Sequence, residues 1–572
     1  MVSPLPDQSP SPSLIPQQTS ERDPLLRDGD APCDPPKPSR SSRFREIALF
    51  TWALVATAAV IIVAVWAQHS SQTSKPKHPN HPGPAGKRNL IFMVSDGMGP
   101  ASLSLTRSYR QYVEDLPIDD VLTLDRHFWG SSRTRSSSSL VTDSAAGATA
   151  FSCGKKSYNG AISVTPDYEP CGSVMEAAKR VGYTTGLVVT TSIADATPAC
   201  FASHVLRREQ QDDIALQEVG DGPLGRSVDL ILGGGRCHFL PNTTSGSCRV
   251  DDIDVTKIAQ EKYGWAYSDN RAGFDSLKKG ENVSLPHLGL YASYDIPFEI
   301  DRRNQNDVYP SLSEMATTAL RALDLATADS DQGFFLMIEG SRIDHAGHDN
   351  DPAAQVREVL EYDRAFKAVI EFLDQSETEG ILVATSDHET GGLGTAIQKP
   401  GHLPTYAWYP QALARANHSG EYLAKQVVKH VLDSANKDES VEELKEWIND
   451  EIVIAGLGIH DATDEELTRL ATFPLKAQPF LTAMISFRAH VGWSTHGHTA
   501  VDVNIYSSGG LAAEALHGNV ENTDVGKFLR EYLSVDAEVE GITKELKEKL
   551  DLGAMDMSAL AQTDGYYHDV DA

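Results

Sequence analysis

Short apolar runs that end in glycine, an acidic residue or histidine constrain the fold of this chain more than any other feature. Five of them are typical of buried strands: Asn89–Ser95, Thr185–Thr191, Val228–Leu232, Phe334–Ile338 and Ile381–Thr385. Helical patterns alternate with these runs, and this order favours a largely parallel sheet covered on both faces. The sequence therefore predicts an α/β protein with a three-layer α/β/α sandwich.

Chemically active side chains directly follow three of these runs. Asp96 follows the first, Glu339 the fourth, and Asp387 with His388 the fifth. A single Asp in such a place is usually a loop or cap residue. Parallel strands, however, deliver their carboxyl ends to one edge of the sheet, where open α/β proteins bind ligands. Three such ends together predict a shared site.

The segment from Glu339 to His348 is dense in residue types that bind metals. Asp344 and His348 are four positions apart, so a helical turn places both on one face. A lone histidine there is as often a core residue as a ligand, but the nearby carboxylates and His388 favour a metal site. Mixed Asp and His ligation suits zinc, whereas carboxylate, hydroxyl and water suit magnesium.

Ser144 precedes small residues that are typical of a helix start. The ordinary interpretation of such a serine is an N-cap. The functional interpretation is a nucleophile at the positive end of a helix, where a phosphoryl group binds well. A serine hydroxyl is a poor nucleophile without a metal or a base. The serine and metal hypotheses therefore depend on each other.

One long apolar run, Ile47 to Ala67, precedes the α/β region. Its length matches the roughly 20 residues that cross a bilayer as a helix, and Trp52 and Trp66 fit an interfacial belt. A buried core helix is a poorer interpretation because polar, Pro-rich sequence flanks the run. A cleaved signal peptide is disfavoured because the run is long and starts far into the chain. We expect one transmembrane helix over residues 47–67.

The flanking charges indicate the orientation of this helix. Arg40, Arg43 and Arg45 adjoin its N-terminal end, so the positive-inside rule keeps the N-terminus cytosolic. Glycosylation sequons at Asn242, Asn282 and Asn417 all follow the anchor. The sequence thus predicts a single-pass type II protein with a lumenal catalytic domain.

The remaining segments divide as follows. Residues 1–46 form a Ser/Pro-rich tail that we expect to be disordered and cytosolic. Within it, Glu21, Leu25 and Leu26 resemble an acidic dileucine signal for a sorting adaptor. Residues 68–87 form a polar linker and 88–535 the catalytic domain, with an inserted subdomain at about 400–490. Residues 536–572 form an acidic tail with a helix over Thr543–Leu550.

Inside the insertion, Thr463 and Glu466 match a capping box, and an amphipathic stretch runs from Val427 to Leu432.

Charge and cysteine content narrow the function further. A net charge of −30 argues against a nucleic-acid partner, because phosphate backbones are bound by surplus Lys and Arg. We expect Cys237 and Cys248 to form a disulfide in an oxidising compartment. Cys153 and Cys171 are candidates for a second pair, which would leave Cys200 over. Cys33 lies in a different compartment.

Six motifs together resemble the alkaline phosphatase family, and most closely its fungal vacuolar, type II membrane members. They are Asp96-Gly-Met-Gly, Thr142-Asp-Ser-Ala-Ala, Asp195-Ala-Thr-Pro, Glu339 through His348, Asp387-His388 and His498-Thr. Their order spans residues 89 to about 530. The resemblance implies hydrolysis of phosphate monoesters with broad specificity, two zinc ions and one magnesium ion per subunit, a homodimer, and a vacuolar membrane location.

The resemblance also assigns roles to residues. Ser144 matches the phosphorylated nucleophile, and Arg208 matches the arginine that clamps phosphate oxygens. One zinc matches Asp344, His348 and His498, and the other matches Asp96, Asp387 and His388. The magnesium matches Asp96, Thr197 and Glu339.

The resemblance is less definite around the magnesium site and in the choice of the last zinc ligand. Asp195 and His345 occupy variable positions next to the magnesium site, where Asp195 would support a hydrated magnesium and His345 would tune affinity or pH optimum. His490 and His496 lie close to His498 in sequence and are alternative ligands. We expect His498 because the alternating segment Val501–Ile505 follows it.

Rival functions make different demands. A sulfatase would need Cys or Ser followed by Pro and Arg at set spacing, and the residues after Ser144 lack both. A phosphodiesterase commonly uses a threonine nucleophile and lacks the third metal site, whereas Thr197 and Glu339 are present. A lumenal binding module that only retains metals would not need Ser144 and Arg208.

Overall fold

The computed structural model describes residues 86–398, 401–434, 440–550 and 552, together with Phe44, Thr51, Trp52 and Thr57. The proposed sorting signal, Cys33 and nearly all of the expected membrane segment lie outside these residues. In the part of the chain that is described, no helix is long and apolar enough to cross a membrane. The chain divides into Met1–His81 and Pro82–Ala572, and the fold below is that of the second unit.

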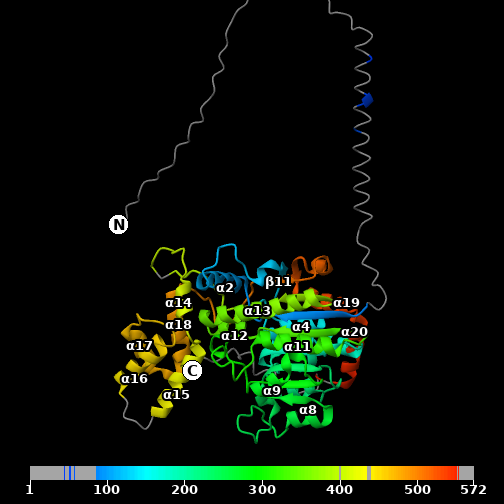
Figure 1. Cartoon of the computed structure of the whole chain (residues 1–572), viewed down its shortest axis with the longest axis horizontal. Coiled ribbons are helices and arrows are strands. Elements are labelled where there is room, and N and C mark those ends of the chain that lie inside the picture. The colour runs from blue at the N-terminus through cyan, green and yellow to red at the C-terminus, as the bar shows by residue number, and fades with distance from the viewer. Residues whose placement is uncertain are drawn as a thin grey trace, which may run out of the picture. The chain divides into compact units, whose positions relative to one another are not determined.

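A ten-stranded sheet forms the centre of this unit (Figure 1), in the order β12-β2-β11-β8-β1-β7-β3-β4-β6-β5. Every neighbouring pair is parallel except those of β11, which runs antiparallel to both β2 and β8. The expected parallel sheet is therefore present. The strands are β1 (Arg88–Val94), β2 (Phe128–Arg133), β3 (Thr184–Ser192), β4 (Leu230–Gly234), β5 (Ala266–Ser268), β6 (His287–Leu290), β7 (Phe334–Glu339), β8 (Glu379–Thr385), β11 (Val503–Ser507) and β12 (Gly518–Glu521), beside a small ribbon of β9 (Glu389–Thr390) and β10 (His498–Thr499).

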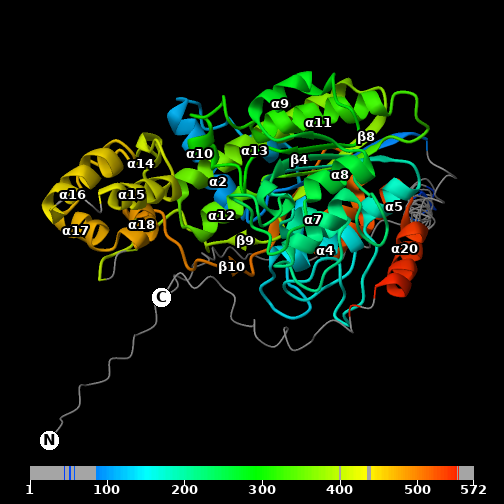
Figure 2. The same cartoon turned by 90° about the horizontal axis from the view of Figure 1, so that it is seen from below.

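Strand β1 shows why the sheet is covered on both faces. Its Leu90, Phe92 and Val94 lie in one hydrophobic core and its Ile91 and Met93 in another, because successive side chains on a strand point to opposite faces. Figure 2 shows the helices above and below the sheet. The first core is covered by α4 (Ser144–Cys153), α5 (Val174–Arg180), α6 (Ala196–Ala202), α7 (Gln211–Val219), α8 (Val255–Tyr263), α19 (Asn522–Leu533) and α20 (Asp536–Lys549), with the 3₁₀ turns η1 (Arg236–Phe239) and η5 (Gly510–Leu516).

The second core is covered mainly by two long helices, α11 (Leu312–Ala326) and α13 (Pro352–Gln375). Shorter helices complete this face or lie at its edge: α2 (Pro100–Val113), α3 (Thr123–Arg126), α9 (Arg271–Ser276), η2 (Lys278–Gly280), α10 (Glu299–Arg302) and α12 (Arg342–His348). The two helical layers give the α/β/α arrangement that the sequence predicts.

A third hydrophobic core belongs to the helices between β9 and β10, which lie to one side of the sheet in Figure 2. They are α14 (Pro410–Arg415), α15 (Gly420–Ser434), α16 (Val441–Trp447), the π-helical η3 (Ile448–Ile454), α17 (Asp464–Thr472), η4 (Pro474–Lys476) and α18 (Ala477–Ala489). Thr463 caps α17 and forms the expected capping box with Glu466. Leu105 and Tyr109 of α2 join this core, so the inserted subdomain packs on the main body.

The C-terminal helix α20 differs from expectation. It begins at Asp536, well before the expected Thr543, and it buries Val539, Ile542 and Leu546. Gly172 N donates to Thr543 Oγ1 at 2.9 Å. The segment after residue 535 therefore starts as part of the folded body, because its apolar spacing supplies a face for the first core.

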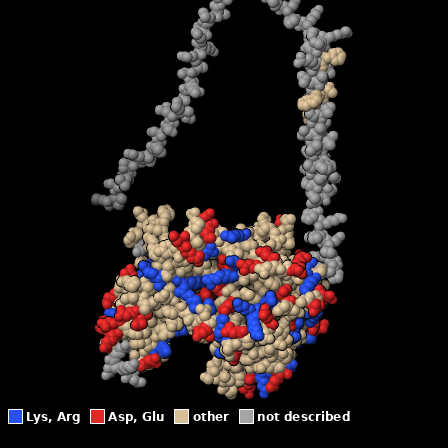
Figure 3. Space-filling view, viewed as in Figure 1, with Lys and Arg blue, Asp and Glu red and all other residues tan. Residues whose placement is uncertain are grey.

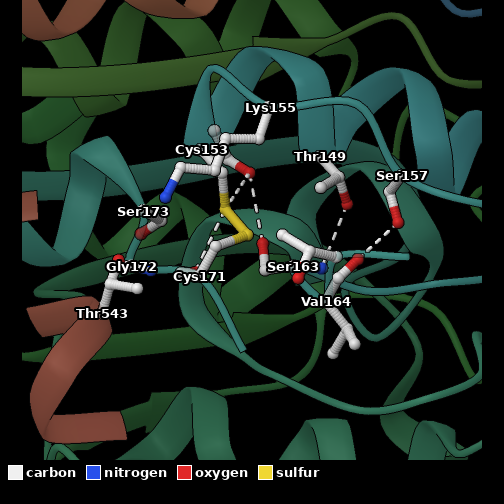
Figure 4. Close-up of a disulfide and its surroundings, with 12 residues drawn as sticks. Thr149, Cys153, Lys155, Ser157, Ser163, Val164, Cys171, Gly172, Ser173 and Thr543 are labelled. Carbon is white, nitrogen blue, oxygen red and sulfur yellow. Dashed lines mark hydrogen bonds between the residues drawn. A yellow bond between two sulfur atoms is a disulfide. The ribbon is translucent and has the colours of Figure 1, made fainter. Parts of the chain in front are cut away.

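Among the described cysteines, Cys153 pairs with Cys171 and Cys237 with Cys248, and Cys200 is a buried free thiol. Figure 4 shows Cys153, the last residue of α4, joined to Cys171 beside Ser163 and Thr149. Thr149 Oγ1 donates to the Ala161 carbonyl at 3.1 Å. The C-terminal half of α4 is thus fixed to the following loop.

The surface of the second unit carries both signs of charge. Figure 3 shows acidic side chains spread over the viewed face and Lys and Arg gathered near its middle, above a hollow beside the inserted subdomain. Asn242, Asn282 and Asn417 are all exposed, as an attached glycan requires.

Candidate functional site

Four neighbouring strands carry the expected site residues to one edge of the sheet. In the order β8-β1-β7-β3, Asp387 and His388 follow β8, Asp96 follows β1, Glu339 ends β7, and Thr197 lies in α6 after β3. The strands are parallel and in register, so their carboxyl ends lie together. The structure therefore brings together residues that are up to three hundred positions apart.

A first cluster consists of Asp96, Asp387 and His388, whose ligand atoms all lie within 4.8 Å of one another. His388 Nε2 is 3.1 Å from Asp387 Oδ2 and 3.6 Å from Asp96 Oδ1. Both of these oxygens are buried, and neither has a hydrogen-bond partner within the described ranges. Buried carboxylate oxygens normally have partners, so this pair is suited to a cation.

A second cluster consists of Asp344, His348 and His498. His348 Nε2 lies 3.3 Å from Asp344 Oδ2, and His498 Nε2 lies 3.5 Å from Asp344 Oδ1. The two imidazole Nε2 atoms are 3.1 Å apart, so both turn toward the same point beside one carboxylate. His498 also stacks on His388 at 3.5 Å between ring centroids, which places the two clusters side by side.

Of the three candidate histidines, His498 of β10 is the one whose ring reaches the second cluster. His498 Nδ1 contacts the Thr142 carbonyl at 2.8 Å, which leaves Nε2 for the cluster. His496 instead contacts the His348 carbonyl through Nδ1 at 2.7 Å. His490 follows α18 as its C-cap, and its ring packs against Tyr409.

A third group of oxygens adjoins the first cluster. Thr197 Oγ1 donates to Asp96 Oδ2 at 3.2 Å, and Ser341 Oγ donates to Glu339 Oε2 at 2.6 Å. Asp96 thus faces His388 with one oxygen and Thr197 with the other. An oxygen-only group of this kind matches the preference of magnesium.

Crowded carboxylates dominate the electrostatics of the site. Burial, reinforced by the charges of Asp387 and Asp344, raises the pKa of Asp96 well above its usual value. Burial also raises the pKa of Glu339 to about 8, against the hydrogen bond from Ser341. A divalent cation would supply the missing positive charge. The donor set therefore fits bound metal ions.

Two histidines explain why one carboxylate behaves differently. Burial raises the pKa of Asp344, but His348 and His498 outweigh it and hold this pKa well below the usual value. The second cluster is thus a carboxylate with two imidazoles, a ligand set that suits zinc.

Ser144 points into the first cluster from the N-terminus of α4. Its Oγ lies 3.0 Å from His388 Nε2, and the residue is only 3% exposed. Asp143, not Ser144, is the N-cap, since its side chain accepts from Ala146 N at 3.0 Å. The serine hydroxyl is therefore free of the capping role that the ordinary interpretation assigns to it.

Two carboxylates hold Arg208, and one of them belongs to Asp143, the residue before Ser144. Its Nη2 donates to Asp195 Oδ1 at 2.9 Å, and its Nη1 lies 3.5 Å from Asp143 Oδ2. The guanidinium side chain is 29% exposed, so an anion can reach it. Asp195 thus positions the arginine as well as standing near the third oxygen group.

His345 faces away from the zinc-type clusters. Its Nδ1 lies 3.4 Å from Asp295 Oδ2 and 3.3 Å from Arg342 Nε. Burial opposes protonation, but Asp295 raises the pKa of His345 to about 9. His345 therefore pairs with the Asp295 carboxylate.

Three contributors were not predicted from the sequence. Thr390 Oγ1 donates to Asp344 Oδ1 and lies 3.2 Å from His388 Nδ1. Its position two residues after His388 is a signal, because residues i and i+2 of a strand share a face. Asp143 directly precedes Ser144, and this adjacency is its signal in the sequence. Asp295, in the loop after β6, carries no local signal.

Comparison with known proteins gives the same picture across most of the chain. The sequence model for "Alkaline phosphatase" matches residues 87–535. "Repressible alkaline phosphatase" of Saccharomyces cerevisiae is 54% identical over 505 residues, which cover 85% of this chain and 88% of that protein. "Alkaline phosphatase" of Schizosaccharomyces pombe is 47% identical over 480 residues, covering 83% and 86%.

Solved structures agree with the fold. A cold-active alkaline phosphatase from Shewanella sp. superposes with a TM-score of 0.63 at 30% identity and covers 78% of this chain and 99% of its own. Thermus thermophilus alkaline phosphatase gives a TM-score of 0.65 at 26% identity, covering 82% and 98%.

Proposed function

This chain belongs to the alkaline phosphatase family of phosphomonoester hydrolases, and on that premise we propose that it acts through a phosphoserine at Ser144. The observation that carries the proposal is the placement of Ser144 Oγ, 3.0 Å from His388 Nε2 in the first cluster, directly after Asp143, whose Oδ2 lies 3.5 Å from Nη1 of the partly exposed Arg208. A nucleophile, a cation site and an oxyanion clamp are the parts that phosphoryl transfer needs.

We assign the metals to the clusters by donor type. Asp344, His348 and His498 would hold one zinc, and Asp96, Asp387 and His388 the other. The oxygen group of Asp96, Thr197 and Glu339 would hold magnesium. Bound there, the metal ions would lower the pKa of the Ser144 hydroxyl and stabilise charge on the attacking and leaving oxygens.

The protein's own residues perform the rest of the reaction. Ser144 Oγ loses its proton to solvent and attacks phosphorus in line with the ester oxygen, the P–O ester bond breaks, and the departing alkoxide takes up a proton from solvent to leave as the alcohol. Arg208 donates two N–H groups to nonbridging oxygens and holds them during the transfer. A water molecule then attacks phosphorus from the vacated side, which releases phosphate and restores the Ser144 hydroxyl.

Substrate specificity depends on which part of the ester the described side chains bind. Arg208 and the clusters contact the phosphoryl group, not the alcohol, so we expect broad activity on monoesters. The motif resemblance to fungal vacuolar members of the family is the ground for proposing a vacuolar membrane setting, a lumenal catalytic domain and a homodimer. The exposure of Asn242, Asn282 and Asn417 is compatible with a glycosylated lumenal face. Recognition of Glu21, Leu25 and Leu26 by a sorting adaptor belongs to the same proposal.

Phosphate release from an aryl phosphate by the purified full-length protein tests the mechanism, with and without chelator and beside Ser144→Ala. We expect activity to disappear on chelation, to return with zinc plus magnesium, and to be absent in the variant. Brief exposure to ³²P-labelled substrate at acid pH should label the wild type alone. Labelling of Ser144→Ala, or cleavage only of diesters or sulfate esters, would overturn the proposal. Bound metals without turnover would favour a binding module.

A further inference from the structure

A buried arginine links the inserted subdomain to the helix that carries the zinc-type ligands. Arg342 begins α12, two residues before Asp344, and its side chain is only 7% exposed. Its Nη2 donates to Glu421 Oε2 at 2.6 Å, and Glu421 lies in the first turn of α15. The subdomain therefore supplies the closest carboxylate to this guanidinium.

The position of Glu421 is itself fixed by the main body. Just before it, Gly420 N donates to Asp351 Oδ2 at 2.8 Å, and Ser419 N donates to Asp301 Oδ1 at 3.2 Å. The α15 N-terminus is thus clamped by two carboxylates from another part of the fold. Glu421 also pairs with the exposed Lys425, so its two oxygens serve different partners.

The other contacts of Arg342 leave it little freedom. Its guanidinium carbon lies 3.7 Å from the ring centroid of Phe298, and its Nη1 donates to the Ile296 carbonyl at 3.3 Å. The next carboxylate is Asp295, 3.9 Å from Nε. If Glu421 lost its charge, the buried guanidinium would be drawn toward Asp295, because an unpaired buried charge is costly.

Asp295 also forms contacts next to the oxygen-only group of Asp96, Thr197 and Glu339. Its Oδ1 accepts from Ser192 N at 3.0 Å, and its Oδ2 faces His345. Ser192 ends β3, and Asp195 and Thr197 follow within five residues. The Ser192 carbonyl in turn accepts from Asp195 N at 3.1 Å. Asp295 therefore sets the start of the turn that carries the expected magnesium residues.

We propose that Glu421 is a positioning residue for the magnesium site: by holding Arg342 it keeps the guanidinium from drawing Asp295 away from Ser192 N, so that Asp295 fixes the Ser192–Thr197 turn. This inference rests on the proposed function, which places magnesium at Asp96, Thr197 and Glu339. It assigns to the inserted subdomain a part in metal retention at a site to which it contributes no ligand.

Metal content measures this role without reference to activity. Full-length protein is dialysed against a series of free Mg²⁺ concentrations, and bound magnesium and zinc are determined by atomic emission. Glu421→Gln should raise the magnesium concentration for half occupancy by about 10-fold or more, the usual effect of losing an outer-shell partner, with zinc unchanged. The kcat should fall at low magnesium and recover at high magnesium, with KM unchanged. Lys425→Gln, which removes the exposed partner of Glu421, should behave as wild type.

A double variant separates charge re-pairing from simple loss of packing. In Glu421→Gln/Arg342→Met no guanidinium is left to compete for Asp295, so magnesium affinity should move back toward wild type. Equal loss of zinc and magnesium with a lower Tm, no change in Glu421→Gln, or no recovery in the double variant would each overturn the inference. A wild type that binds no magnesium at any concentration would instead defeat the proposed function.

Discussion

Gly147, in the helix that presents Ser144, packs directly on Asp387. A Cβ built on Gly147 would lie 3.0 Å from the Asp387 Cβ, closer than side chains tolerate without movement. Gly147→Ala should therefore displace Asp387 by a few tenths of an ångström and lower kcat by up to about tenfold. Gly147→Val should cost more than about 100-fold, since misplacement near 1 Å has effects of that size. Steady-state kinetics with zinc analysis of both variants checks this.

The matched control for that series is Gly541→Ala. Gly541 lies in α20 with open space where a Cβ would stand. Replacing a helical glycine by alanine should leave kcat unchanged and stabilise the fold by about 0.5–1 kcal/mol. A Gly147→Ala enzyme as active as Gly541→Ala would contradict close packing of α4 on the site.

The sheet and most of the site could be predicted because both depend on local patterns. Apolar runs such as that of β1 fixed the strands, and the residue after each run faces the ligand edge whatever the rest of the chain does. Asp96, Glu339 and Asp387 needed no long-range information. Their roles as ligands came from the resemblance and remain proposals.

Residues that act through contacts distant in sequence could not be found in this way. Glu421 meets Arg342 only because α15 packs on the main body, and Asp295 reaches Ser192 from the loop after β6. Neither has a spacing that marks it. The early start of α20 could not be predicted because its packing partner, α5, lies far away in the sequence.

Arg208→Lys should separate charge from geometry at the oxyanion clamp. The guanidinium is oriented by Asp195 and Asp143, and a lysine keeps the charge but cannot donate two parallel N–H groups. We expect kcat/KM to fall by about 10- to 100-fold, corresponding to about 1.5–3 kcal/mol of charge-assisted hydrogen bonding. Arg207→Lys, its neighbour in the chain, is the control. An unchanged kcat/KM in Arg208→Lys would mean that Arg208 acts only through its charge, and an equal loss in Arg207→Lys would mean that the effect is not specific to Arg208.

Metal removal should make stability depend on pH through Glu339. Burial raises the pKa of this carboxyl to about 8, against about 4.3 in the unfolded chain. Between these values the metal-free folded state binds the extra proton, so its stability falls as pH rises. The Tm difference between metal-loaded and chelated protein should therefore widen from about pH 5 to about pH 8. Glu339→Gln should lessen this widening, and a constant difference in the parent would refute the assignment.

Removal of either disulfide should lower the stability of the protein by a similar amount, but only removal of Cys153–Cys171 should lower its catalytic activity. They close loops with sequence separations of 18 and 11 residues, which on loop-closure grounds stabilise by about 3 kcal/mol each. Only Cys153 lies in the helix that begins with Ser144. Cys153→Ser/Cys171→Ser should lower both Tm and kcat, whereas Cys237→Ser/Cys248→Ser should lower Tm alone. Loss of kcat in the second pair would show that the effect on α4 is not local.

Acid should destabilise the fold through His287, far from the metal clusters. The residue is 4% exposed, its Nε2 lies 2.9 Å from Ser268 Oγ, and burial lowers the pKa of His287 to about 4. The unfolded value is about 6.5. Between the two the unfolded chain binds the extra proton, so stability present above about pH 6.5 is lost as pH falls toward 4, by up to about 3 kcal/mol.

Urea unfolding across this range measures the effect of His287. His287→Gln should be less stable than the parent near pH 7, because a packed ring is lost, but its stability should fall less on acidification. His460→Gln, at an exposed position, should keep the parent's pH dependence. If His287→Gln and the parent lose stability in parallel, protonation of other buried groups must govern the acid response, and His287 is accessible to protons in the folded state.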